Sequence, residues 1–321
     1  MNKEKMMKMH YELELEKVKN EVKKSDPNKV LIQLPEGLKD ESKRIIDKVK
    51  SVKEKLDVTL DGEIVHGACC IPEEPEREKY DLVIHFGHTE MVPADNVIYV
   101  PVKSKEEVKN VAEKAAERSK GEKIGLTTTT QHLHKLEEMK KGIEKAGKEP
   151  VTREGDQFIK EAQVLGCCFI SATEIRDEVD SFIFIGSGKF HALGVANSTD
   201  LRVIQGNPYK NEVNEIEPGK WKREKEMRKD KARDPESFAI IETPYPGQTS
   251  HKVTEQVNEK LEKNGKDTYK VKLSQITPNR INHLPFDAFV INACPRIVRD
   301  DWSNYDKPIL LPKEAEELVK S

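Results

Sequence analysis

The sequence predicts an α/β protein made of three related domains with parallel sheets. Three observations support this prediction. Short apolar segments are followed by a turn and a helical pattern, the arrangement occurs three times along the chain, and each copy then reaches a second apolar segment that begins with aspartate. Continuous apolar strands that alternate with helices are typical of parallel sheets built from strand–helix–strand units.

The first copy begins at residues 29–39, "KVLIQLPEGLK", where a buried-strand pattern runs into a Pro/Gly turn. A helical pattern follows at residues 40–56. Residues 122–147 and 237–265 repeat the design of strand, loop and helix, and Gly147 is placed as a helix stop. The three segments therefore predict the first strand, loop and helix of three related units.

The second apolar segments start at Asp81, Asp180 and Asp287, at similar intervals after the first strand of each copy. This spacing predicts a first domain over residues 1–103 that includes an N-terminal amphipathic helix, a second over 104–212 and a third over 213–321. The charged segment 214–235 is expected to form a helical connector, with a solvated face, between the second and third domains.

Composition limits the possible functions. The net charge of −3 argues against polycationic binding to nucleic acid as the main function. The chain has no apolar run long enough to span a membrane, and its lysine-rich N-terminus has no apolar core of a signal peptide. We therefore expect a cytoplasmic protein, in which thiols stay reduced and cysteine clusters more often indicate metal binding or catalysis than disulfides.

The five cysteines lie in three places, one in each predicted domain. Cys69 and Cys70 form one doublet, Cys167 and Cys168 form a second, and Cys294 stands alone. Each group is close in sequence to the second apolar strand of its copy. Ligands of open α/β sheets gather outside the carboxyl ends of the strands, so the three groups are expected to surround a shared point.

Three thiolates with an open fourth position suit an iron–sulfur cluster that keeps one iron free for a substrate. Structural zinc is disfavoured because no C-x₂-C pair occurs. Buried cysteines that act as small hydrophobic residues are the plainer alternative, although their placement in all three copies argues against it.

Three loops that follow the predicted strands carry residues suited to an anionic ligand such as a carboxylate. They are "LPEGLK" at 34–39, "GSGKFHALG" at 186–194 and "TPYPGQTS" at 243–250. Ordinary strand–helix turns use the same residues for backbone geometry, and this alternative stays open. Histidines near the strand ends could serve as bases, ligands or packing residues: His66, His85, His88 and His191.

The motifs "LPEGL", "HGACC", "HFGHTEM", "GSGKFHALG", "YPGQ" and "NACPRI", in this order, resemble the archaeal diphthamide biosynthesis enzymes. These transferases attach a 3-amino-3-carboxypropyl group to a histidine of elongation factor 2. The resemblance implies three Rossmann-like domains in a pseudo-threefold arrangement, a homodimer and one [4Fe–4S] cluster. S-adenosylmethionine would bind the unique iron, and an external electron donor would support reductive cleavage of its Cγ–S bond.

Carried over residue by residue, the resemblance implies that Cys69, Cys167 and Cys294 hold the cluster. Our candidates for contacts to S-adenosylmethionine are Gly186, Gly188, His191 and Gln248, and no catalytic residue is assigned beyond the cluster ligands. The chain departs from the family pattern in "GACCIPEE", in its second cysteine doublet and in Thr249, where an arginine often follows the glutamine. The roles of Cys70 and Cys168 stay open.

Two other functions stand beside this one. A quinolinate-synthase-like enzyme also places three cysteines around an open-iron cluster, which there acts as a Lewis acid. A non-catalytic subunit that binds a cluster or a partner protein is the second alternative. The motifs "NACPRI" and "KFHALG" favour the diphthamide resemblance over the first, and a cysteine group in every copy argues against the second.

Overall fold

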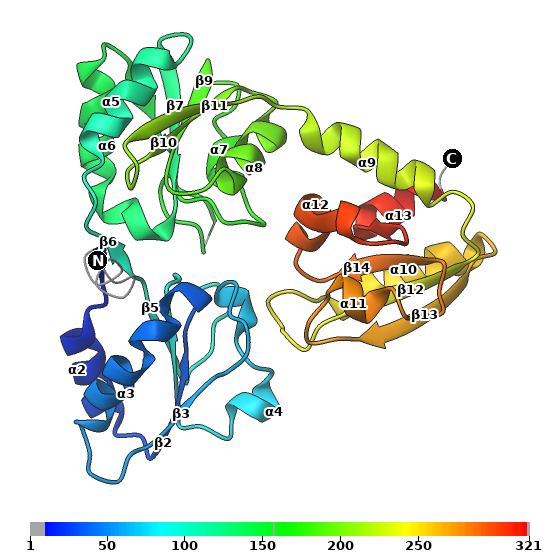
Figure 1. The fold of residues 1–321 in the computed structure, drawn as a ribbon, viewed down its shortest axis with the longest axis horizontal. Coiled ribbons are helices and arrows are strands. Elements are labelled where there is room, and N and C mark those ends of the chain that lie inside the picture. The colour runs from blue at the N-terminus through cyan, green and yellow to red at the C-terminus, as the bar shows by residue number, and fades with distance from the viewer. Residues whose placement is uncertain (1–9, 157, 320–321) are drawn as a thin grey trace. The chain divides into compact units, whose positions relative to one another are not determined.

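The computed structural model describes residues 10–156 and 158–319. They form two compact units, one built from the chain up to Ala68 together with Glu74–Pro218, the other from Cys69–Glu73 and the residues from Gly219 onward. Both units combine helices with mainly parallel sheets, which confirms the predicted fold class (Figure 1). The predicted domain boundaries near residues 103 and 212 stay predictions.

The first unit holds two large sheets. In the first, four parallel strands lie in the order β3-β2-β4-β5. Every residue of β4 is buried, as a strand covered on both faces requires. The bounds are β2 (Lys29–Gln33), β3 (Asp57–Leu60), β4 (Leu82–Phe86) and β5 (Val97–Val100).

The second sheet of this unit has the order β11-β10-β9-β7-β8. All neighbours are parallel except β11, which pairs antiparallel with β10. Figure 1 shows α5 and α6 on one face of this sheet and α7 and α8 on the other. The bounds are β7 (Lys123–Thr128), β8 (Glu149–Val151), β9 (Ser181–Ile185), β10 (Val203–Asn207) and β11 (Glu212–Ile216).

The expected charged connector is shorter than predicted. Its helix, α9, covers Lys220–Lys231, whereas the start of the segment lies in strand β11 (Glu212–Ile216) and residues 217–219 link the two. Pairing with β10 along its whole length overrides the helical reading of this charged segment, because the edge of the second sheet supplies partners for its backbone. Residues 214–216 therefore belong to a strand, and the helical prediction was wrong there.

The second unit contains one sheet of four parallel strands in the order β13-β12-β14-β15. Alternate residues of β12 enter two separate hydrophobic clusters, with Phe238 and Ile240 in one and Ala239 and Ile241 in the other. Both faces of this sheet are therefore covered. The bounds are β12 (Ser237–Glu242), β13 (Asp267–Lys272), β14 (Ala288–Asn292) and β15 (Ile309–Leu310).

The strand order is the same in the three sheets, apart from the added β11, as three related copies require. In each, the first strand lies in the middle, between the next strand along the chain and the strand that follows the marker aspartate. The carboxyl end of the middle strand is therefore a topological switch point, where loops leave toward opposite sides and open a crevice.

The structure shows why an aspartate precedes the second strand of each copy. Asp81 accepts hydrogen bonds from the backbone N–H groups of Asn28 and Lys29, at 2.7 and 2.9 Å, where β2 begins. Asp180 does the same for Glu122 and Lys123, at 2.8 and 2.9 Å, where β7 begins. In each case a carboxylate satisfies backbone donors that the sheet leaves open at the start of its middle strand.

The third copy varies this device. Asp287 accepts from the backbone N–H and the hydroxyl of Ser237, at 3.0 and 2.7 Å. These hydrogen bonds hold the pKa of all three aspartates below the usual value of 3.8. The aspartate repeat is thus a structural signature of the three copies.

A two-stranded sheet pairs β1 (Tyr11–Glu12) antiparallel with β6 (Lys103–Ser104). The predicted N-terminal helix is present only as α2, which begins at Leu15. The prediction was wrong at residues 11–12, which form strand β1 because β6 supplies partners for their backbone. The part of the predicted helix before residue 10 lies outside the described residues. No helix in the described ranges is long and apolar enough to cross a membrane.

The α-helices are α2 (Leu15–Ser25), α3 (Ser42–Lys50), α4 (Glu74–Arg77), α5 (Lys109–Arg118), α6 (Leu136–Lys145), α7 (Ile170–Thr173), α8 (Phe190–Thr199), α9 (Lys220–Lys231), α10 (His251–Lys263), α11 (Pro278–Ile281), α12 (Arg296–Asp301) and α13 (Pro312–Leu318). Short 3₁₀ turns are η1 (Glu36–Glu41), η2 (Ala68–Cys70), η3 (Thr130–Lys135) and η4 (Trp302–Asn304).

Candidate functional site

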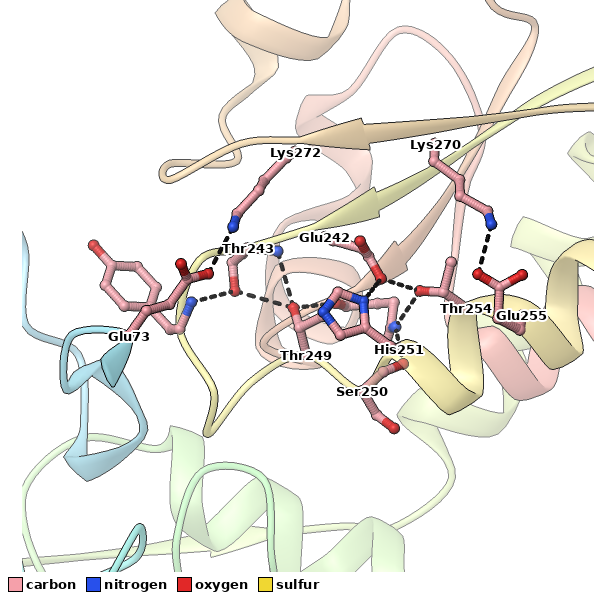
Figure 2. A network of polar contacts seen from close by, with 12 residues as sticks. Glu73, Glu242, Thr243, Thr249, Ser250, His251, Thr254, Glu255, Lys270 and Lys272 are labelled. Carbon is pink, nitrogen blue, oxygen red and sulfur yellow. Dashed lines mark hydrogen bonds and ion pairs between the residues drawn. The ribbon is translucent and has the colours of Figure 1, made fainter. Parts of the chain in front are cut away.

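In the second unit, the loop after β12 is fastened to the end of β14 by a threonine pair (Figure 2). The backbone N–H of Thr243 donates to Thr249 Oγ1 at 2.9 Å, and the Thr249 hydroxyl donates to the carbonyl of Asn292 at 2.9 Å. The hydroxyls of the two threonines lie 3.2 Å apart. Thr249, the departure from the family pattern, is therefore a structural pin for this loop.

The side chain of Asn292 continues this network toward α10. Its Nδ2 donates to the carbonyl of Ser250 at 2.8 Å and to the Thr254 hydroxyl at 2.7 Å. The Thr254 hydroxyl donates in turn to Glu242 Oε1 at 2.5 Å, and His251 Nδ1 lies 3.1 Å from the same oxygen (Figure 2). The carboxyl ends of β12 and β14 and the start of α10 thus form one polar assembly.

The pinned loop directs Gln248 at the first cysteine doublet. Gln248 Nε2 lies 3.2 Å from the Sγ of Cys70 and 3.5 Å from the Sγ of Cys69, and the two sulfurs are 4.0 Å apart. An amide N–H that donates to sulfur favours the thiolate over the thiol. The segment Cys69–Glu73 packs in this unit, and Lys272 fastens its end through an ion pair with Glu73 at 2.6 Å.

Cys294 lies in the same unit, two residues beyond β14 and just before α12. Burial raises the pKa of its thiol, the charge of Cys70 raises it further, and the backbone N–H and guanidinium of Arg296 act in the opposite direction. The loop of the first cysteine doublet and the loop of Cys294 are therefore electrostatic neighbours. Cys69 is partly buried and Cys70 fully buried.

The second doublet belongs to the first unit. Cys167 is exposed and Cys168 is partly buried, and desolvation raises the pKa of the Cys168 thiol. All five cysteines are free thiols. Over the described residues of each unit, no three His, Cys, Asp or Glu side chains are grouped closely enough to hold a metal ion. Convergence of three sulfurs from both units stays a prediction.

The predicted glycine loop follows β9 in the first unit. Gly188 has a φ of 73°, which favours glycine, and Gln205 Nε2 donates to the carbonyls of Gly188 at 2.6 Å and Gly186 at 3.3 Å. The ring of His191 stacks on Phe184, with centroids 5.7 Å apart and planes at 17°. Gln205 thus fixes the loop through two backbone carbonyls. Contacts between this loop and a cofactor stay predictions.

Two of the candidate histidines belong to a buried chain of hydrogen bonds in the first sheet. Gln33 Nε2 donates to Asp61 Oδ2 at 2.8 Å, and Gln33 Oε1 lies 3.0 Å from His85 Nδ1. His85 Nε2 lies 2.9 Å from His88 Nδ1. Burial lowers the pKa of His85 well below 6.5 and that of His88 to about 4, so both imidazoles are neutral at pH 7.

His66, the remaining histidine of the sequence prediction, is exposed and lies three positions before the first doublet in the chain. The sequence reasoning missed two buried residues of the first unit. Gln163 Nε2 donates to the hydroxyls of Thr89 and Thr130, both at 2.8 Å, and so joins the loops after β4 and β7. His132, in the turn after β7, is 1% exposed. No local sequence pattern signals this burial, because it depends on how the neighbouring sheet packs.

The donor set fits the cluster that the sequence predicts, because free thiols are the ligands of iron–sulfur clusters. In the second unit, two of the three cysteine loops are brought together, and an amide donor is directed at one of them. Hydrogen bonds to cluster sulfurs are a recognised means of tuning such a centre. The third loop, with Cys167, carries an exposed thiol in the other unit.

Fold and loops together define an α/β protein whose candidate functional residues follow the strands of repeated parallel sheets. A family model described as "Putative diphthamide synthesis protein" matches residues 34–321. The chain therefore belongs to the diphthamide synthesis family, as its motifs predicted.

Curated relatives agree with this assignment. The chain is 34% identical to the 2-(3-amino-3-carboxypropyl)histidine synthase of Pyrococcus horikoshii, over 97% of this chain and 91% of the relative. It is 29% identical to the synthase of the same name from Methanocaldococcus jannaschii, with the same coverage of each chain. Subunit 1 of the synthase of Schizosaccharomyces pombe is 28% identical over 97% of this chain and 74% of the relative.

The fold matches a solved structure as well. The crystal structure of Dph2 from Pyrococcus horikoshii with a 4Fe-4S cluster aligns with a TM-score of 0.87 and 32% identity, covering 97% of this chain and 92% of that one. The prediction that the chain is an enzyme of this family is confirmed. An iron–sulfur cofactor is supported by this structural relative.

Proposed function

We propose that this chain transfers the 3-amino-3-carboxypropyl group of S-adenosylmethionine to a histidine of elongation factor 2, the first step of diphthamide synthesis. The observation that carries the proposal is membership of a family whose relatives bear the name 2-(3-amino-3-carboxypropyl)histidine synthase over almost the whole chain. The pairing of the first cysteine loop with the Cys294 loop, next to Gln248, supports it independently.

In this proposal, Cys69, Cys167 and Cys294 hold a [4Fe–4S] cluster. When bound, the cluster supplies the electron for reductive cleavage of the Cγ–S bond and an open iron for the co-substrate. The chain orients the thiolates. The hydrogen bonds among Thr243, Thr249 and Asn292 hold the Gln248 loop against the end of β14, two residues before Cys294. The loops at the strand ends would exclude water and align the sulfonium group of the co-substrate.

Contacts to S-adenosylmethionine are proposed for Gly186, Gly188, His191 and Gln248. Gln248 Nε2 is directed at the cysteine sulfurs, so its amide oxygen is the atom that would accept from the ammonium group of the co-substrate. The glycine loop would offer backbone N–H groups to the carboxylate. A homodimer, an external electron donor and a cytoplasmic location complete the proposal.

The test is anaerobic reconstitution with iron and sulfide, followed by S-adenosylmethionine, dithionite and elongation factor 2. Methylthioadenosine and a factor carrying one added aminocarboxypropyl group are the expected products. Each predicted ligand has a matched control in its own neighbourhood. Cys69→Ser and Cys167→Ser should lose the cluster absorbance and the product, whereas Cys70→Ser and Cys168→Ser should keep both. Cys294→Ser should behave like the first pair.

Deoxyadenosine as the main product would contradict the proposed bond cleavage. A chain that binds no cluster under these conditions would contradict the cofactor. Loss of the cluster in Cys70→Ser with retention in Cys69→Ser would reverse the ligand assignment within the doublet, while leaving the reaction in place. Sedimentation of the reconstituted protein tests the homodimer.

A further inference from the structure

The first unit contains a cavity of about 250 Å³ between the carboxyl ends of its two large sheets. Its walls come from loops that follow β2, β4, β7, β9 and β10. The polar residues that line it include His88, Thr129, Gln131, His132, Ser187 and Tyr209. Its position at two neighbouring switch points is where α/β proteins bind ligands.

The loops around this cavity are joined by side-chain amides. Gln131 Nε2 donates to the carbonyl of Gly87 at 3.1 Å, linking the loop after β7 to the loop after β4. Gln163, which is fully buried, holds the hydroxyls of Thr89 and Thr130 together from the other side. The cavity is therefore a built feature of the first unit, with walls fastened across both sheets.

The lining mixes polar and apolar residues and carries no charge at neutral pH. None of the lining residues is Asp, Glu, Lys or Arg. Desolvation lowers the pKa of both His88 and His132 to about 4, so both rings are neutral at pH 7. A carboxylate, phosphate or sulfonium would find no opposite charge here, whereas an uncharged polar ring would find hydrogen-bonding partners.

The protonation state of His88 follows from the chain of hydrogen bonds behind it. Asp61 accepts from Gln33 Nε2, so Gln33 Oε1 faces His85 and His85 Nδ1 must donate to it. His85 Nε2 is then the acceptor, and His88 Nδ1 donates to it. The neutral His88 ring is left with Nε2 as an acceptor, because a neutral imidazole carries one proton.

His132 supplies the second polar atom. The residue is 1% exposed, and its Nδ1 has no hydrogen-bond partner among the described residues. A buried polar atom without a partner destabilises the folded chain, and a complementary ligand would recover this loss. Tyr209 forms an aromatic wall beside it, with ring centroids 5.6 Å apart.

We propose that this cavity binds an uncharged nitrogen heterocycle, whose ring N–H or amino group donates to His88 Nε2 and whose second polar atom pairs with His132 Nδ1. The volume is below the ~300–1,000 Å³ of sites that enclose a whole drug-sized ligand, so one ring system enters rather than a complete nucleotide. Ser187 and Gly37 are exposed at its edge and mark the entrance.

Two substrates of the proposed reaction carry such a ring. Only the choice of these two as the source of the ring rests on the proposed function. S-adenosylmethionine has an adenine, and the target histidine of the protein substrate has an imidazole. Both offer a donor and an acceptor on one flat, uncharged ring. The binding itself needs neither the cluster nor catalysis, so it can be measured on the chain as purified.

The experiment is calorimetry and ligand-observed NMR on the full chain at pH 7.5 with adenosine, with N-acetylhistidine methylamide and with cyclohexanol as an uncharged ring without nitrogen. Saturable 1:1 binding of one nitrogen heterocycle is expected. His132→Phe should weaken it at least tenfold, because the ring shape stays while both nitrogens are lost. Ser187→Phe, a change at the exposed entrance, should do the same without touching either imidazole. His283→Phe, an exposed histidine in the other unit, is the matched control and should bind like the wild type.

Preference for adenosine assigns the ring to the co-substrate, and preference for the histidine amide assigns it to the protein substrate. The inference is overturned if cyclohexanol binds with the same affinity as the two probes. It is also overturned if the probe affinities are unchanged in both His132→Phe and Ser187→Phe. A chain that binds a probe yet releases no methylthioadenosine after reconstitution keeps this inference and sinks the proposed function. A chain that forms product but binds neither probe supports the proposed function and overturns this inference.

Discussion

The charged helix α9 is anchored by a buried ion pair, and this pair gives a quantitative prediction for the second unit. Arg228 is 2% exposed and Glu314 of α13 is 4% exposed. Arg228 Nη2 donates to Glu314 Oε1 at 2.5 Å and its Nε donates to Oε2 at 3.2 Å, in a bidentate arrangement. Glu314 Oε2 also accepts from the backbone N–H of Leu311 at 3.1 Å.

Glu314→Gln preserves the shape of the side chain and removes its charge, which leaves the Arg228 guanidinium buried without a counterion. Breaking a buried pair in this way costs about 3–5 kcal/mol. With a urea dependence of about 2 kcal/mol/M for a unit of this size, the unfolding midpoint should fall by about 2 M. By contrast, Arg228→Met with Glu314→Leu should recover most of the loss, because no charge stays buried.

The assay is urea unfolding followed by tryptophan fluorescence. The chain has two tryptophans, Trp221 and Trp302, and both belong to this unit, so the signal reports on it alone. Glu316→Gln, on the same helix, is the control, because the Lys260–Glu316 pair is partly exposed and should be worth less than about 1 kcal/mol. If Glu314→Gln unfolds at the same midpoint as Glu316→Gln, the reasoning from burial is wrong.

Three further predictions concern pH and the loop pin. The pKa of Asp287 is held below 3.8, so its stabilising effect should be complete above that pH and disappear as the pH falls through the lowered value. Asp287→Asn should therefore unfold earlier than wild type at pH 7, and the difference should shrink as the pH is lowered below 3.8. The pKa of His132 is lowered from 6.5 to about 4, so the stabilisation by its neutral ring is complete above pH 6.5 and is lost toward pH 4. Between pH 7 and 5 the free energy of unfolding should fall by about 2 kcal/mol more in wild type than in His132→Gln. Circular dichroism in denaturant measures this difference. Thr249→Val should destabilise the second unit by about 1–3 kcal/mol in the tryptophan assay, and Thr249→Ser, which keeps the hydroxyl, should not.

The repeated fold was predictable because its signals are local. Buried strands of four to six residues, each followed by turn residues and an amphipathic helix, can be recognised from the local sequence pattern. The marker aspartate also had to recur, since each copy needs an acceptor for the backbone donors that open its middle strand. The connector was mispredicted at its start because strand pairing with β10 is a tertiary contact that no local pattern records.

Site residues that depend on long-range contacts were harder to predict. Gln163 lies 74 positions from Thr89 in the chain, and only the fold brings them together. His132 resembled an ordinary turn residue, because burial is decided by the neighbouring sheet. Gln248 was predicted as a cofactor contact from its motif, but its approach to the Cys70 and Cys69 sulfurs required the packing of a segment that is distant in sequence.

One position shows how a single fold supports different chemistry in its three copies. Two residues beyond the strand that follows the marker aspartate stand His88 after β4, Ser187 after β9 and Cys294 after β14. The shared topology brings this position to the carboxyl end of each sheet, beside the switch point. The side chain then decides the role: the soft thiol of Cys294 suits metal binding, and the imidazole of His88 and the small hydroxyl of Ser187 line the uncharged cavity. Exchanging His88 for cysteine would therefore place a thiol where the first sheet now offers a neutral acceptor, and should remove heterocycle binding without creating a cluster ligand in the second unit.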